Sequence, residues 1–482
     1  MVKKAVKSKR TDPAGLKIPN AWDQLPAKEV TLLEERAKRY MKFLDNCKTE
    51  RETIEYILEL ARKEGFKPLP RLGAGKKLKP GSRVYFINKN RAMGLAIIGK
   101  KSHLEGFRLI AAHHDVPKLD IKQTPLYEKD GMALLKTHYY GGVKKFQWVT
   151  MPLALHGFAI TKDGKKLNVR IGEKPTDPVF TITDIAIHLS RKLQDDRKSS
   201  AAIAGEELNL VIGHKPVPKR KKGDEDKPNR VKEAIIKHLH TELGMEEEDF
   251  AWGEFHAVPA HPSREVGFDR SMIGGYGHDD RGCVYASFEA LCEIKVPEYT
   301  SAILMLDKEE IGSCGANGAQ SMMVTDFLGM LVEAASGNAT FADIRSTISE
   351  TMVISADTSP PIDPTFSSTH DPLNSATLGK GVWVSKYSGS GGKMFSGEAD
   401  VEFINYIRKM LSKEKIPYQF GELGKVDEGG GGTVAFLLSN LNMHVVDVCL
   451  PTLSLHSPFE LISKVDYHYT VSAYKAFMEK AY

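Results

Sequence analysis

The sequence has few cysteines and no long apolar run. Its 482 residues include five cysteines, an odd number, scattered without a CxxC pair. This pattern argues against a disulfide framework and a thiolate zinc site, and it indicates a reducing compartment. No run approaches the roughly 20 apolar residues that span a bilayer, and no apolar segment follows the basic residues 1–10 as in a secretory signal. We therefore expect a cytoplasmic protein that does not bind membranes.

Several common enzyme motifs are also missing. The chain has no GxSxG motif and no Cys-His arrangement that would supply a covalent nucleophile. Two glycine-rich segments, residues 388–392 and 429–432, lack the Walker lysine-serine pair and the GxGxxG spacing, which favours a backbone-lined substrate groove over phosphate binding. The net charge is only +5, and the basic stretch 215–222 has no interleaved aromatic residues. We expect no binding to nucleic acid.

The length and the pattern of elements predict two domains. Residues 1 to about 25 are interpreted as a flexible basic arm, and residues 26–65 as helices. Within residues 118–266 the sequence predicts short strands, a helix at 185–193, a mobile charged loop at 214–230 and a helix at 230–243. The strands expected there are 133–139, 147–153, 157–161 and 167–171. We interpret residues 118–266 as a β-rich domain inserted into a catalytic domain formed by residues 1–117 and 267–482.

In the two flanking segments, strands alternate with helices. The expected strands are 84–88, 94–98, 107–112, 301–306, 352–356 and 445–450. The expected helices are 283–294, 401–411 and 466–482. This alternation predicts an α/β fold with a mixed, largely parallel sheet and helices on both faces. The carboxyl ends of its parallel strands would lie along one edge, where ligands bind in such sheets.

Five of these strands or turns end in histidine, aspartate or glutamate. The residues are His113 with Asp115, Asp279 with Asp280, Glu309 with Glu310, Asp357, and His456. Each alone has a structural explanation as a core histidine, a helix cap or an Asx turn. At one sheet edge they would form the nitrogen and oxygen ligand set of zinc, cobalt or manganese. A bridging carboxylate would hold two ions about 3.5–4 Å apart, and an adjacent glutamate would serve as general base.

The motifs resemble those of the aspartyl aminopeptidase family of two-metal exopeptidases, in order and spacing, over nearly the full length. They are AHHDVP (112–117), YYGG (139–142), IAIHL (185–189), AVPA (257–260), GHDDR (277–281), DKEEIGS (307–313), SAD (355–357), GGGGT (429–433) and LSLHS (453–457). The resemblance implies a zinc-exopeptidase-like fold that removes the N-terminal residue from peptides. It also implies two divalent ions, zinc in the first place, and an inserted domain that mediates oligomerisation into a dodecamer and gates the substrate.

The resemblance further implies a role for each site residue. The implied metal ligands are His113, Asp279 and Asp357 for one ion, and Asp279, Glu310 and His456 for the other. Glu309 would be the general base that deprotonates the attacking water, and Asp115 would orient His113. His188 would reach the active site of a neighbouring subunit, and Lys386 would contact the substrate.

One segment departs from the eukaryotic members of that family. They carry histidines after the ligand aspartate, where this sequence reads TSPPIDP (358–364), so it looks more like the bacterial branch. No metal ligand is lost, but the preference for an acidic N-terminal residue is left open. A two-metal carboxypeptidase and an amide deacylase on the same scaffold are the alternatives. Both usually carry a smaller inserted domain, and the motif order favours the aminopeptidase.

Overall fold

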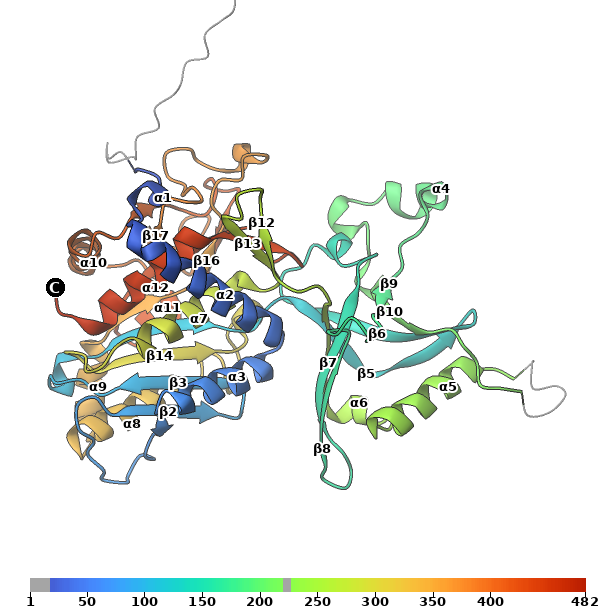
Figure 1. The fold of residues 1–482 in the computed structure, drawn as a ribbon, viewed down its shortest axis with the longest axis horizontal. Coiled ribbons are helices and arrows are strands. Elements are labelled where there is room, and N and C mark those ends of the chain that lie inside the picture. The colour runs from blue at the N-terminus through green and yellow to red at the C-terminus, as the bar shows by residue number, and fades with distance from the viewer. Residues whose placement is uncertain (1–17, 220–226) are drawn as a thin grey trace, which may run out of the picture. The chain divides into compact units, whose positions relative to one another are not determined.

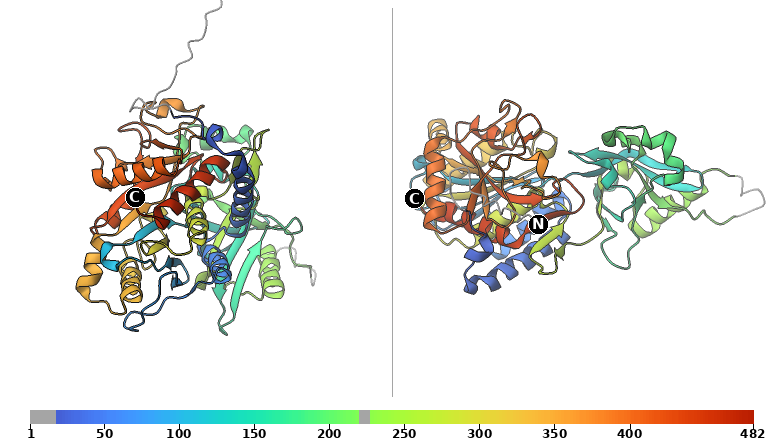
Figure 2. Two further views of the ribbon diagram at one scale, coloured as in Figure 1. Left: turned by 60° about the vertical axis from the view of Figure 1, so that its left-hand side comes forward. Right: turned by 90° about the horizontal axis from the view of Figure 1, so that it is seen from above.

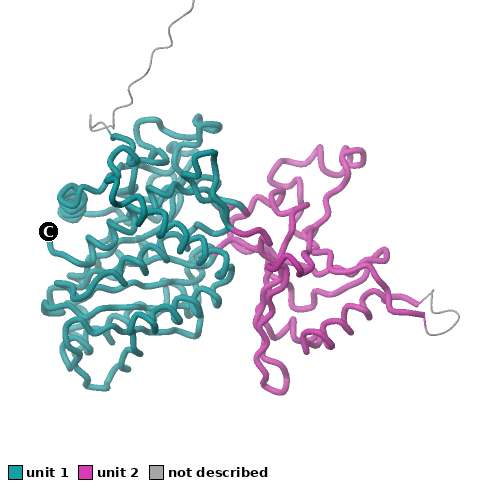
Figure 3. The backbone as a smooth tube through the Cα atoms, in the orientation of Figure 1, with its two compact units in different colours: residues 1–115, 263–455, 459–482 teal, residues 116–262, 456–458 magenta. Residues whose placement is uncertain are grey.

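The computed structural model describes residues 18–219 and 227–482, and the chain divides into two compact units (Figure 3). Unit 1 takes residues from 1–115, 263–455 and 459–482, and unit 2 takes residues 116–262 and 456–458. Each unit has its own large sheet. Within the described residues, no helix is both long and apolar enough to cross a membrane.

Unit 1 is built on a mixed sheet whose central strands are parallel (Figure 1). In spatial order the strands are β1 (Lys67–Pro68), β2 (Arg83–Asn88), β3 (Ala92–Ile97), β14 (Ser301–Leu306), β4 (Arg108–His113), β15 (Met352–Ser355), β21 (His444–Leu453), β22 (Glu460–Ser463), β13 (Met272–Gly275) and β12 (Arg264–Val266). Strands β14, β4, β15 and β21 run parallel to one another, and β3 and β22 flank them in the antiparallel direction. Three further strands attach near β21: β16 (Thr358–Ser359), β17 (Val382–Ser385) and β19 (Tyr418–Phe420).

Helices cover both faces of this sheet (Figures 1 and 2). On one face lie α2 (Val30–Asn46), α3 (Glu50–Lys63), α7 (His278–Cys292), α10 (Val401–Lys413) and α12 (Lys464–Glu479). On the other lie α8 (Met323–Ser336), α9 (Phe341–Ser349) and α11 (Ala435–Ser439). Successive side chains of β4 alternate between the two cores, since Ile110 and Ala112 join the first and Leu109 and Ala111 the second. The predicted α/β class is confirmed.

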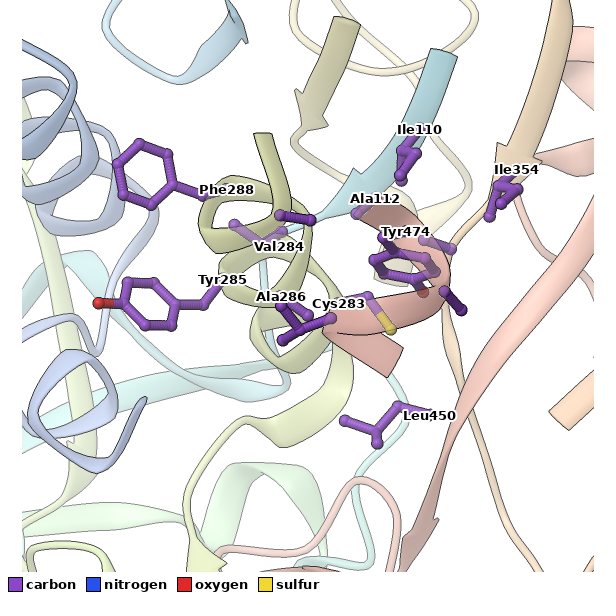
Figure 4. Packing of buried hydrophobic residues seen from close by; sticks show 14 of the residues in the cluster. Ile110, Ala112, Cys283, Val284, Tyr285, Ala286, Phe288, Ile354, Leu450 and Tyr474 are labelled. Atoms are coloured by element: carbon purple, nitrogen blue, oxygen red, sulfur yellow. The ribbon is translucent and has the colours of Figure 1, made fainter. Parts of the chain in front are cut away.

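The first core is packed around α7. Figure 4 shows Val284 and Cys283 of this helix beside Ile110 and Ala112 of β4, with Tyr474 of α12 nearby. All of these side chains are buried. Because α7 is enclosed on all sides, nearly every residue along it is buried, and its N-terminus is fixed against the sheet.

The N-terminal helices begin earlier than the sequence predicted. The prediction of a flexible arm over residues 1 to about 25 was wrong for its last residues, because α1 (Ala21–Gln24) is helical and Ala21 is buried. The Asn20 side chain accepts a hydrogen bond from the amide of Trp22 and so caps this helix. The rest of the predicted arm, residues 1–17, lies outside the described residues.

Unit 2 contains an antiparallel sheet with short helices. Its strands in spatial order are β8 (Lys166–Ile171), β7 (Leu153–Ile160), β11 (Glu254–Pro259), β5 (Lys118–Lys129), β6 (Met132–Tyr140), β10 (Asn209–Gly213) and β9 (Thr181–Ile182). Its helices are α4 (Ile187–Ser190), α5 (Arg230–His238) and α6 (Asp249–Trp252). Residues 220–226 of the predicted charged loop lie outside the described residues.

The strand prediction for residues 147–153 was wrong. Residues Lys145–Gln147 form a 3-10 turn, and β7 begins only at Leu153 and runs through the second predicted strand to Ile160. Strand β5 was not predicted, and neither were α8 and α9 of unit 1. The apolar residues of 147–153 pack in a turn, where Trp148 is fully buried, so their burial did not require a strand.

Candidate metal centre

Three neighbouring parallel strands bring acidic and histidine side chains to one edge of the unit 1 sheet. Strand β4 ends at His113, and its register partner in β14 is Leu306. A 3-10 turn that starts with Glu309 and Glu310 follows β14. On the other side of β4, Asp357 follows β15 by two residues. The shared register of parallel strands therefore accounts for the convergence that the sequence predicted.

The first cluster of ligand atoms joins His113, Asp279 and Asp357. One ligand atom from each lies within 4.8 Å of the others, and all three residues are buried. The Nε2 atom of His113 is 3.4 Å from Asp279 Oδ1 and 3.7 Å from Asp357 Oδ1. Asp279 comes from the first turn of α7, and the peptide bond between Asp279 and Asp280 is cis. The cluster thus combines residues from three elements.

The second cluster joins Asp279, Glu310 and His456. Their ligand atoms also lie within 4.8 Å of one another, and Asp279 belongs to both clusters. His456 follows β21, and its Nδ1 donates a hydrogen bond of 3.0 Å to the carbonyl oxygen of Gly142 in the YYGG motif. A Cβ atom at Gly142 would lie 3.1 Å from that nitrogen, so glycine keeps the approach open. With Nδ1 acting as donor, Nε2 is left as the ligand nitrogen.

Asp115 links the histidine to the glutamate turn. The Nδ1 atom of His113 donates to the backbone carbonyl of Asp115 over 3.0 Å and lies 3.3 Å from the Asp115 carboxylate. The same carboxylate accepts the backbone amides of Glu309 at 3.1 Å and Glu310 at 3.2 Å. These hydrogen bonds from the glutamate turn to the Asp115 carboxylate were not predicted from the sequence. One buried carboxylate therefore contacts parts of both clusters.

The local electrostatics favour a bound cation. Burial raises the pKa of Glu309 to about 8; the positive charge of a protonated His113 lowers it, and the nearby carboxylates raise it. Burial also raises the pKa of Asp357. For His113, burial lowers the pKa, but its carboxylate neighbours reverse this and hold it well above the usual value. Two histidines and three carboxylates are a donor set that fits zinc, whose charge would offset this crowding.

Some residues of the centre were missed or lie outside the two clusters. Glu460 of β22 is buried and accepts the backbone amide of Asp279 over 3.1 Å, and no sequence signal marked it. His188 is exposed on α4. Lys386 follows β17, and its Nζ lies 3.7 Å from Glu398 Oε1. Among the residues that the structure describes, neither His188 nor Lys386 belongs to a cluster of ligand atoms.

Comparison with known proteins places this chain among peptidases. The family model of the aminopeptidase I zinc metalloproteases (M18) matches residues 43–478. The chain belongs to the M18 family of aminopeptidases. Over 460 residues it is 42% identical to the probable M18 family aminopeptidase 1 of Clostridium acetobutylicum, covering 95% of this chain and 97% of that protein. The crystal structure of an M18 family enzyme from Thermotoga maritima matches with a TM-score of 0.89 at 37% identity, over 96% of this chain and 100% of that one.

Membership of the M18 family confirms the predicted family and activity. The protein is an aminopeptidase and a zinc metalloprotease, which decides against the carboxypeptidase and amide deacylase alternatives. The mApe1 dodecamer of S. cerevisiae shares the fold, with a TM-score of 0.73 at 17% identity over 93% of this chain and 97% of that one.

Proposed function

We propose that this M18 aminopeptidase holds two zinc ions that share one carboxylate. The proposed ligands are His113, Asp279 and Asp357 for one ion, and Asp279, Glu310 and His456 for the other. The observation that carries the proposal is the presence of Asp279 in both clusters of ligand atoms. When bound, two zinc ions would polarise the scissile carbonyl, activate water and anchor the free amine of a peptide.

The chain's own residues would move the protons. Glu309 Oε2 lies 4.0 Å from His113 Nε2, next to the first cluster without belonging to it. From there Glu309 would accept the proton of the attacking water and pass it to the nitrogen of the leaving peptide. Asp115 would keep His113 oriented for binding through its contacts with Nδ1.

The finer features of the enzyme are also proposals. We propose a homo-oligomer, a dodecamer like that of mApe1, in which residues 118–266 mediate assembly and gate substrate access. Exposed apolar side chains on α4, Ile187 at 82% and Leu189 at 69% exposure, are consistent with an interface there. His188 lies between them and would act at a neighbouring subunit's site, while Lys386 would contact the substrate. Free cysteines fit a cytoplasmic enzyme.

The test measures release of N-terminal residues from a panel of unblocked dipeptides with zinc, cobalt or manganese added. We expect cleavage of free-amine peptides, none of N-acetylated ones, and loss of activity in Glu309→Gln. Glu333→Gln is the matched control, because Glu333 is a buried glutamate that binds the amides of Gly73 and Gly75 instead.

Three further readouts complete this test. Metal analysis of the assembled enzyme should give two zinc ions per chain, and one ion per chain would contradict the shared-carboxylate arrangement. No release with any metal, from folded and assembled protein, would contradict the proposed chemistry. The ranking across the panel would determine whether aspartate and glutamate are preferred.

A further inference from the structure

Two glycine-rich loops of unit 1 form a small ribbon. Strand β18 (Gly389–Ser390) pairs antiparallel with β20 (Gly430–Gly431). A Cβ atom at Gly430 would lie 2.7 Å from the carbonyl oxygen of Gly389, and one at Gly429 would lie 2.4 Å from that of Leu423. These two glycines are therefore explained by close packing of one backbone against another.

Two other glycines of the ribbon have no such explanation. At Gly392 and Gly432, a Cβ atom would meet nothing within 4 Å, and neither residue has a left-handed φ. Among the glycines in the described parts of the chain, only these two combine both properties, and one lies in each loop. Both are exposed. A glycine that its own fold does not require, despite its cost in chain entropy, is suited to close approach by another backbone.

The ribbon is tied to the strand that leads to Asp357. The Ser355 hydroxyl of β15 donates to the hydroxyl oxygen of Thr433, the residue after Gly432, over 3.4 Å. Ser355 lies two residues before Asp357 on an extended segment, so the two positions are about 7 Å apart and face the same side. The exposed backbone at Gly432 is therefore connected to the first metal cluster through its neighbour Thr433 and through Ser355.

A buried carboxylate binds Thr433, the residue that follows the second loop. Asp447 of β21 is 1% exposed, and its Oδ1 accepts a hydrogen bond of 2.8 Å from the Thr433 hydroxyl. Burial raises the pKa of Asp447 to about 7, and the hydroxyls of Ser355 and Thr433 lower it. Asp447 is thus positioned to hold the second loop against the sheet.

We propose that the exposed backbone at Gly392 and Gly432 binds the main chain of the peptide substrate, and that Asp447 and Thr433 are positioning residues for this surface. The inference rests on the proposed function, because it assigns the substrate side of that same centre. Contact with the main chain is independent of the peptide's side chains. The surface would therefore contribute to KM for all N-terminal residues alike.

The first test uses Gly432→Ala and Gly392→Ala. Each added methyl group enters open space at an ordinary φ, so we expect an unchanged melting temperature and unchanged zinc content. We expect KM to rise about tenfold, because the added methyl group would prevent one good hydrogen bond to the substrate. The value of kcat and the ranking of N-terminal residues should stay unchanged. Peptide affinity measured by calorimetry in a Glu309→Gln background should fall by the same factor. An unchanged KM and affinity in both variants would overturn the proposed surface.

The second test addresses the positioning residues. Thr433→Val removes the hydroxyl at nearly constant volume and should raise KM, while Thr433→Ser should restore it. Thr347→Val is the matched control, since Thr347 is a buried threonine whose hydroxyl donates to the backbone carbonyl of Asp343 in α9. If Thr433→Val lowers the melting temperature as this control does but leaves KM unchanged, the positioning role is wrong.

The outcomes separate this inference from the proposed function. An inactive wild-type enzyme would contradict the aminopeptidase chemistry itself. An active wild type whose glycine variants bind and cleave peptides normally would contradict only the substrate surface. Asp447→Asn keeps an acceptor for Thr433 and is expected to resemble Thr433→Ser rather than Thr433→Val.

Discussion

Asp115 is the residue on which the geometry of the proposed centre depends most. It contacts His113 through its carbonyl and carboxylate oxygens, and it accepts the amides of both Glu309 and Glu310. The two glutamates follow β14 in a tight turn, whose course these two amides help to fix. A change at Asp115 would therefore displace a ligand, the general base and the histidine together.

The prediction at this scale concerns Asp115→Asn. The side chain of asparagine replaces one of the two acceptor oxygens of Asp115 by an NH2 donor. This donor would face a backbone N–H group of the glutamate turn. We expect kcat/KM and zinc affinity to fall by roughly 10–100-fold, as for other groups that orient metal ligands. Enzyme assays and zinc titration with a competing chelator would measure both.

Asp307→Asn is the control for this prediction. Asp307 is equally buried but pairs with Arg91, with 3.0 Å between Arg91 Nε and Asp307 Oδ2. This variant should lose stability while its zinc affinity stays near the wild-type value. Equal losses of zinc affinity in the two variants would show that Asp115 acts only through general stability.

At the scale of elements, α12 is attached to the N-terminal helices through a buried histidine. His468 Nδ1 lies 3.3 Å from Arg36 Nη1 of α2, and its Nε2 lies 3.3 Å from Glu29 Oε2. A neutral ring satisfies both partners by accepting from Arg36 and donating to Glu29. Burial, followed by the charge of Arg36, lowers the pKa of His468 to about 4.

This predicts a loss of stability in mild acid. The unfolded chain binds a proton at His468 near pH 6.5, whereas the folded chain does not until about pH 4. The stabilisation from the neutral His468 ring is therefore complete above pH 6.5 and is lost as the pH falls toward 4. Over this range the free energy of unfolding falls by at most about 1.4 kcal/mol per pH unit. Urea unfolding at pH 7 and pH 5 would measure it.

His468→Asn should reduce the difference in unfolding free energy between these two pH values. His444→Asn is the control, because His444 is 42% exposed in its side chain and pairs with Asp400 at the surface. The His444→Asn variant should keep the wild-type difference in unfolding free energy between pH 7 and pH 5. An unchanged difference in His468→Asn would mean that other groups cause the acid sensitivity.

At the scale of the whole molecule, the proposed action of His188 in trans makes activity a property of the assembly. His188→Ala and Glu309→Gln proteins should each have little activity. Mixed assemblies obtained by co-expression should regain part of it, because some sites then combine an intact Glu309 with a neighbour's His188.

Two variants that each change a residue of the subunit's own site should not complement each other, because every site in the mixture is then damaged. Co-expression of Glu309→Gln with Glu310→Gln is therefore the control, and no activity should return. Steady-state assays on assemblies purified by size would compare the two mixtures. A lack of recovery in the first mixture would contradict the role of His188 in trans.

The parts of the fold that the sequence predicted well are those with strong local patterns. Apolar strand runs such as residues 301–306, and helices with three- and four-residue spacing such as 401–411, appear as expected. Strand β5 was missed because its polar and apolar residues do not alternate regularly, and its pairing with β6 is interrupted between Ile121 and Leu126. Residues 147–153 were misassigned because the burial of Trp148 comes from tertiary packing and not from strand pairing.

The sequence by itself determined which chemistry the chain carries. The residue types and their motif order indicated a zinc aminopeptidase, and family membership confirmed it. Only the tertiary structure decided which side-chain atoms meet. The register of the parallel strands β14, β4 and β15 places His113, Asp357 and the glutamate turn at the same edge of the sheet. Only the structure brought Glu460 of β22 to Asp279 of α7, 181 residues away, and the carboxylate of Asp447 to the hydroxyl of Thr433. Both contacts depend on how separate elements pack, and no local pattern encodes them.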